Sequence, residues 1–115
     1  MSAVADIRTQ QDGDVQIAVL EGEVDSSNAQ EVDVRLRALL TNRAMAMIVD
    51  LTRIVYLDSA GINVMFQLGD DLRSRQQTLH LVVDPATPIA RMLAITALDR
   101  AQPTHRTLDE AIAAA

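Results

Sequence analysis

Residues 46–62 have the sequence AMIVDLTRIVYLDSAGI, which sets a buried strand shortly before the start of a helix. The first four residues, 46–49, are a continuous apolar run, which is typical of a central strand covered on both faces. Asp50 ends that run, and residues 51–57 form a moderately apolar connection to the helix. We therefore expect a strand, a connection and a helix at the centre of the fold.

Asp58 and Ser59 mark the start of that helix, which the sequence predicts to run to about Gln76. Side-chain oxygens at such positions accept hydrogen bonds from the unpaired N–H groups of the first turn, and this capping role alone accounts for the pair. Gly61 is harder to explain in this way, because glycine is a poor helix former that lets a partner approach the backbone closely. The start of the helix is therefore a candidate contact site.

The apolar residues of the same helix fall on two sides. At about 100° per residue, one stripe forms the expected core face, and it contains Val64, Met65, Leu68 and Leu72. Ile62 and Phe66 lie outside that stripe, on the same flank as Gly69. Either a neighbouring helix covers them, or they form an exposed apolar flank beside Ser59 on which a protein could dock.

Strands and helices alternate on both sides of this segment. Residues 4–9 and 15–20 are Val- and Ile-rich, and Asp12-Gly13 between them predicts a tight antiparallel hairpin. The other expected elements are a helix opened by Ser27 or Asn28 and ending near Thr41-Asn42, a strand at 79–83, a helix at 88–98, a weak strand at 101–105 and a short helix opened by Thr107. Such alternation predicts an α/β fold with a mixed, mostly parallel sheet of four to five strands, packed by about four helices.

The composition fits one folded domain. The chain has 115 residues, 49% of them hydrophobic and 23% charged, so we expect a single domain over 1–115 with a core at about 4–112. Cysteine is absent, which excludes a disulfide framework, a thiolate zinc site and a cysteine nucleophile.

The charge balance limits the classes of molecule that we expect the protein to bind. There are 16 acidic residues against 10 basic ones, and the net charge of −6 argues against direct binding to nucleic acid or an anionic membrane. An acidic surface instead suits a basic patch on another protein. Neither a membrane-spanning run nor a signal-peptide pattern is found, so a cytoplasmic location is expected.

No residue pattern indicates catalysis, a metal or a cofactor. His80 and His105 are expected in a strand and a loop with no clustered metal ligands around them. The glycines form no phosphate-binding loop, and Ser59 lies in no nucleophile-elbow motif. We therefore expect a protein that is not an enzyme.

Three segments together carry a resemblance to a known family. They are Gly22-Glu23-Val24-Asp25, the apolar strand ending in Asp50-Leu51, and Tyr56-Leu57-Asp58-Ser59-Ala60-Gly61-Ile62. In order and spacing they resemble the STAS domain of the bacterial anti-sigma factor antagonists, and the similarity covers nearly the whole chain.

The resemblance implies a phosphorylation switch at Ser59. In that family an anti-sigma factor that is also a serine kinase, supplying ATP and Mg²⁺, phosphorylates the serine at this position. Asp25 is implied to lie near Ser59 and contact the kinase, although a helix cap or turn residue is the alternative for it. Asp58 is implied to cap or orient the Ser59 turn. The family often has a second Ser or Thr where this chain has Ala60.

Gly61, Ile62 and Phe66 complete the partner-binding surface that the resemblance implies. The unphosphorylated protein would then sequester the anti-sigma factor and free a sigma factor for transcription. Two alternatives stay open: a STAS scaffold or transport-accessory module, stressosome-like or lipid-transport-like, and a small nucleotide-binding module. Weak homodimer formation is also left open.

Overall fold

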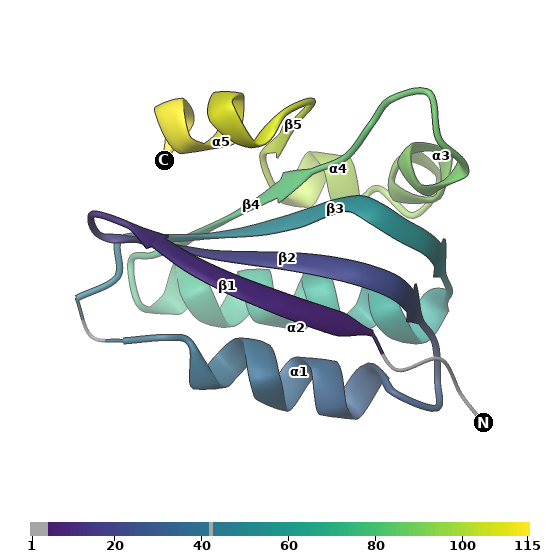
Figure 1. The fold of residues 1–115 in the computed structure, drawn as a ribbon, viewed down its shortest axis with the longest axis horizontal. Helices are drawn as coiled ribbons and strands as arrows, with labels where there is room; N and C mark the ends of the chain where they lie inside the picture. The colour runs from purple at the N-terminus through teal and green to yellow at the C-terminus, as the bar shows by residue number, and fades with distance from the viewer. Residues whose placement is uncertain (1–4, 42) are drawn as a thin grey trace.

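A computed structural model of the chain describes residues 5–41 and 43–115. Five strands form one sheet in the order β1-β2-β3-β4-β5 (Figure 1). Their bounds are β1 Asp6–Asp12, β2 Val15–Val24, β3 Ala46–Leu57, β4 Thr78–Val82 and β5 Thr104–His105. The strands β1 and β2 are antiparallel, and every later pair is parallel, so the predicted fold class is confirmed.

The helices of the described residues are α1 Ala29–Ala38, α2 Ser59–Ser74, α3 Pro88–Ile95, α4 Leu98–Ala101 and α5 Leu108–Ala114. Figure 1 shows α1 and α2 on one face of the sheet and α5 on the other. The larger core fills the α1–α2 face and includes the predicted stripe of Val64, Met65, Leu68 and Leu72. A smaller cluster lies under α5 and contains Ile17, Ile48, Val82 and Ala111. The central strands are therefore apolar on both faces.

The predicted hairpin is confirmed. Gly13 has a φ of +59°, which glycine adopts without strain, and Asp12 pairs with Val15 across the turn. The first strand begins at Asp6 and continues to Asp12, past the predicted end at residue 9. Residues 1–4 lie outside the described part of the chain.

The strand β3 is longer than expected, so the prediction of a connection at 51–57 is wrong. Its second half pairs with the end of β2, but two register shifts interrupt the ladder. Val19 to Glu21 on β2 spans the same distance as Asp50 to Arg53 on β3, which leaves one extra residue on β3. A second extra residue follows at Val55. These bulges destroy the two-residue alternation by which a strand is recognised.

Helix ends differ from the predictions in two places. The helix α1 ends at Ala38 rather than near Thr41-Asn42, and Asn42 lies outside the described residues. The predicted helix at 88–98 is divided into α3 and α4, because Ala97 has a left-handed backbone with a φ of +62°. By contrast, Thr107 caps α5 as expected, with its Oγ1 accepting from the Glu110 N–H at 3.1 Å.

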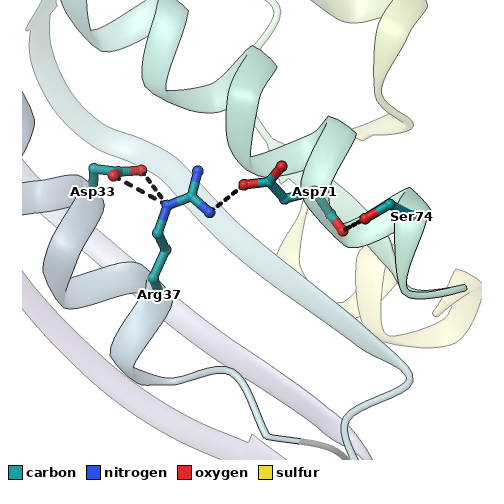
Figure 2. Close-up of polar contacts among 4 residues, drawn as sticks. All are labelled: Asp33, Arg37, Asp71 and Ser74. Carbon is teal, nitrogen blue, oxygen red and sulfur yellow. Dashed lines mark hydrogen bonds and ion pairs between the residues drawn. The ribbon is translucent and has the colours of Figure 1, made fainter.

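An ion-pair bridge joins α1 to α2 (Figure 2). The Arg37 guanidinium on α1 donates from Nε to Asp33 Oδ1 at 2.9 Å and from Nη1 to Asp71 on α2. Next to it, the Ser74 hydroxyl donates to the Asp71 carbonyl oxygen at 2.6 Å. The bridge links the two helices on the solvent side of the larger core.

Candidate functional site

Ser59 is the first residue of α2 and its side chain is exposed. Asp58 immediately before it is the N-cap, as expected, and its Oδ1 accepts hydrogen bonds from the N–H groups of Ala60 at 2.9 Å and Gly61 at 3.3 Å. The Ser59 hydroxyl makes no hydrogen bond to any other part of the described chain. An accessible, unengaged hydroxyl therefore lies on the first turn of a 16-residue helix.

Asp58 also holds a second loop. Its Oδ2 accepts from the Ser26 N–H at 3.3 Å, and its own N–H donates to the Val24 carbonyl at 3.2 Å. Because β2 and β3 are parallel, their carboxyl ends meet at one edge of the sheet, where Val24 pairs with Leu57. The loop that follows β2 is thereby joined to the start of α2.

Asp25 lies in that loop and shapes it. Its Oδ1 accepts from both the N–H and the hydroxyl of Ser27, the former at 2.8 Å. The hydroxyl bond, followed by the backbone bond, lowers the pKa of the Asp25 carboxyl below its usual value. Asp25 is thus a turn residue that stays ionised at neutral pH, while its contact with a partner stays a prediction.

Asn28 is the N-cap residue of α1 but does not form the predicted capping box. Its side chain does not cap the helix. Instead, Oδ1 accepts from the Asp25 N–H at 3.0 Å and Nδ2 donates to the Glu23 carbonyl at 2.8 Å. This buried amide therefore braces the β2–α1 loop against the end of β2, and it fixes the position of Asp25.

Gly61 serves internal packing. A Cβ built at this position would lie 2.4 Å from Leu57 Cδ1 and 3.0 Å from Val24 Cγ1. The glycine lets α2 approach the ends of β2 and β3. The structure thus gives it a packing role that is independent of any partner.

Ile62 is 4% exposed and belongs to the larger core. The interpretation of Ile62 and Phe66 as an exposed flank is therefore wrong for Ile62, and Phe66 is half-buried against the same core. The alternative, that neighbouring elements cover this flank, holds for Ile62, because α2 is packed by α1, α4 and the sheet together and its buried surface is wider than one helical stripe.

Exposed apolar surface lies instead on the strand before Ser59. Val55 is 75% exposed and Tyr56 49% exposed, and both belong to the bulged end of β3. Sequence reasoning missed them, because it assigned residues 51–57 to a connection. The signal available was three consecutive bulky residues, 54–56, which a two-residue strand period cannot all bury.

The two histidines come together on the other face of the sheet. His80 Nδ1 lies 2.9 Å from His105 Nε2, and the rings are stacked. Burial and, secondarily, the charge of His105 lower the pKa of His80. Within residues 5–41 and 43–115 no three His, Asp or Glu side chains gather to hold a metal ion. In the same part of the chain no helix is long and apolar enough to cross a bilayer.

Comparisons with known proteins connect this arrangement to one family. The model of the STAS domain matches residues 6–111. BtrV of Bordetella bronchiseptica, which is named as an anti-sigma factor antagonist, is 35% identical over 65 residues, 56% of each chain. This chain therefore aligns with just over half the length of that curated relative.

Solved structures agree over almost the whole fold. The crystal structure of an anti-sigma factor antagonist from Mycobacterium paratuberculosis has a TM-score of 0.86 and 25% identity, with 99% of this chain and 97% of that chain covered. Unphosphorylated SpoIIAA has a TM-score of 0.75 at 16% identity and 93% coverage of both chains. SpoIIAA of Bacillus in the phosphorylated form matches with a TM-score of 0.69 at 16% identity, covering 93% of this chain and 96% of that chain.

Proposed function

The chain belongs to the STAS-domain family. From this premise we propose that it is an anti-sigma factor antagonist, a regulatory protein and not an enzyme, which binds an anti-sigma factor only while Ser59 is unphosphorylated. Phosphorylation of Ser59 by that partner, which supplies ATP and Mg²⁺ in the cytoplasm, would release the complex. The sigma factor is free for transcription while the unphosphorylated protein holds its inhibitor.

The observation that carries the proposal is the position of Ser59. Its hydroxyl is exposed on the first turn of α2, where a kinase can reach it. A phosphate adds roughly −1.5 to −2 charges, which the positive end of a helix dipole accommodates. The fold of this chain also matches both the unphosphorylated and the phosphorylated SpoIIAA structures. We therefore expect the domain to stay folded after modification.

The same phosphate would disrupt a docked partner. Asp58 caps the turn on which Ser59 lies, and Asp58 is bonded to the loop that carries Asp25. A partner pressed against this surface would have to desolvate a dianion among carboxylates. A loss of about 3 kcal/mol of binding free energy already lowers affinity more than 100-fold.

The proposed contact surface combines charge with a small apolar area. Asp25 and the net charge of −6 suit a basic patch on the partner. Val55 and Tyr56 supply the exposed apolar area that Ile62 does not, since Ile62 is buried. Phe66 is half-buried against the larger core and contributes only the part of its side chain that remains exposed.

Phosphate mapping tests this proposal. The protein is incubated with its cognate anti-sigma factor kinase, ATP and Mg²⁺, and the phosphopeptides are mapped by mass spectrometry. Phosphate is expected on Ser59 and should disappear in Ser59→Ala. By contrast, Ser27→Ala, which removes the hydroxyl bonded to Asp25 at the same edge of the sheet, should be labelled normally. Labelling of other residues with Ser59 unmodified would refute the switch.

A further inference from the structure

A polar groove lies on the sheet face opposite α1 and α2, away from Ser59. Its volume is about 420 Å³, and it lies beside α5, the helix drawn above the sheet in Figure 1. Its lining includes Arg8 and Gln10 of β1, Val19 of β2, Asp50 and Arg53 of β3, and Leu108 of α5. None of the residues assigned to the anti-sigma factor contact belongs to it.

Asp50 is the unusual member of this lining. It is 7% exposed, and its Oδ1 accepts two hydrogen bonds from Thr52, one from the N–H at 2.9 Å and one from Oγ1 at 2.7 Å. Its Oδ2 accepts no hydrogen bond from any described residue. Withdrawing a carboxylate from water is costly unless its oxygens find donors. Oδ2 is not among the buried polar atoms that lack a partner, so it still reaches the solvent in the groove, where a ligand can donate a hydrogen bond to it.

Arg8 carries the opposite charge and is also unpaired within the described chain. The strand pairing places Arg8, Val19 and Asp50 in one row across β1, β2 and β3. Neighbouring strands are about 4.8 Å apart, so the Cα atoms of Arg8 and Asp50 are separated by roughly 10 Å, with Val19 between them. The two charges form no ion pair with each other.

Arg53 adds a second guanidinium to the same groove. Among the described residues it pairs with Glu21 at 3.5 Å, and the two side chains are each about half exposed, with fractions of 58% and 47%. Such a solvent-exposed pair is weak, and it uses one of the five N–H donors of the guanidinium. Donors of Arg53 therefore remain for an anion.

From this arrangement we propose that the groove binds a small organic zwitterion. Its anionic group pairs with Arg8 and Arg53, and its ammonium group donates to Asp50 Oδ2. The chain between the two charged groups lies over Val19 and against Leu108, which are the apolar parts of the lining. A simple anion satisfies only the arginines, and a simple amine satisfies only Asp50.

Titration with ω-amino acids of increasing length tests the proposal and measures the distance between the anion-binding and ammonium-binding parts of the groove. The amide spectrum of the ¹⁵N-labelled protein is recorded at low salt with glycine, 4-aminobutyrate and 6-aminohexanoate, and with butyrate and butylamine as half-ligands. One zwitterion should shift the amide signals of Val19, Asp50 and Leu108 saturably. It should bind at least about tenfold more tightly than either half-ligand, which corresponds to about 1.4 kcal/mol.

Two variants test which side chain binds each charged group of the ligand. Asp50→Asn keeps an oxygen for Thr52 but replaces Oδ2 with a donor, so it should weaken binding of the zwitterion and of butylamine about tenfold or more. Binding of butyrate should not be weakened, because the variant removes a negative charge from the groove. Arg8→Gln, on the exposed edge strand, should weaken the binding of the zwitterion and of butyrate. Arg35→Gln, an exposed arginine of α1 on the other face, is the matched control and should change nothing.

Three results would overturn the proposal: no saturable shift with any zwitterion, equal affinity for the zwitterion and its halves, or affinities that Arg8→Gln leaves unchanged. Unfolding temperatures of all three variants show whether the fold is kept. Should Asp50→Asn unfold, the Arg8→Gln comparison still decides. The proposal is independent of Ser59, since phosphorylated and unphosphorylated protein should bind the same ligand.

Discussion

At the scale of a residue, the Ser59 switch is a question of charge. Replacing Ser59 with Asp places one negative charge on an exposed helix start, where the helix dipole favours it. We expect an unfolding free energy within about 0.5 kcal/mol of the wild type. Affinity for the anti-sigma factor should fall about tenfold or more, measured by calorimetry, because the carboxylate must be desolvated in the interface.

Ser59→Asn is the matched control for that measurement. It has nearly the same shape as aspartate but no charge, and asparagine is accepted near helix starts. It should retain most of the affinity. If Asn and Asp variants lost affinity equally, the effect would be steric, and the charge mechanism would be wrong.

Gly61 illustrates a glycine required by packing. Gly61→Ala would bring a methyl group to within 2.4 Å of Leu57 and 3.0 Å of Val24 as they now lie. Overpacking of this kind costs about 1–3 kcal/mol, which exceeds the gain of about 1 kcal/mol that alanine brings to a helix. Urea unfolding should therefore show a net loss, whereas Asn63→Ala, on the exposed side of α2, should be neutral or stabilising. A stabilised Gly61→Ala would contradict the packing argument.

Ala97 is the opposite case, an alanine where the backbone favours glycine. Its φ of +62° falls in the left-handed region, which costs a residue with a Cβ about 1–2 kcal/mol. We expect Ala97→Gly to stabilise the protein by about 0.5–1 kcal/mol in thermal unfolding, after the greater unfolded-state entropy of glycine is included. Ala94→Gly, within α3, is the control and should destabilise by about 1 kcal/mol.

At the scale of an element, α1 and α2 are joined by the Arg37 bridge (Figure 2). The bonds to Asp71 and Asp33 raise the pKa of Arg37, so the guanidinium stays charged. Since these side chains are partly exposed, Arg37→Met should cost only about 0.5–1 kcal/mol. The difference in urea stability should shrink as salt is raised to about 1 M, because salt screens exposed pairs. An unchanged difference would assign the effect to packing.

Elements also show what sequence patterns can and cannot predict. The hairpin and the starts of α2 and α5 were predictable, because each depends on a few adjacent residues with known turn or capping chemistry. The second half of β3 was not, since its two bulges arise from pairing with β2, a partner distant in the sequence. The division at Ala97 was missed for a related reason: nothing about alanine signals a left-handed backbone.

In the candidate site, too, some features follow from adjacent residues and others from elements that are distant in the sequence. Asp58 and Ser59 could be located from the chain alone, since a cap and an exposed first-turn residue are local features. The burial of Ile62 depends on elements that surround α2, and the exposure of Val55 depends on the bulge in β3. The bond from Ser26 N–H to Asp58 Oδ2, which joins the two loops, spans 32 residues and has no sequence signature.

At the scale of the whole molecule, the His80–His105 pair makes stability depend on pH. Burial, and then the charge of His105, lower the pKa of His80 below its ordinary value of 6.5. In the unfolded chain His80 therefore binds a proton at a higher pH than it does in the fold. Stability should be fully present above about pH 6.5 and decrease as the pH falls below it, until His80 is protonated in the folded protein as well.

His80→Leu should flatten this part of the pH profile of urea unfolding, because a neutral side chain remains under all conditions. His105→Asn is the informative partner variant. It removes the secondary cause of the lowered pKa but leaves His80 buried, so it should reduce the slope without abolishing it. A slope in His80→Leu equal to that of the wild type would assign the pH dependence to other groups. Complete loss of the slope in His105→Asn would instead make the charge of His105 the main cause of the lowered pKa. That result would contradict burial as the larger cause.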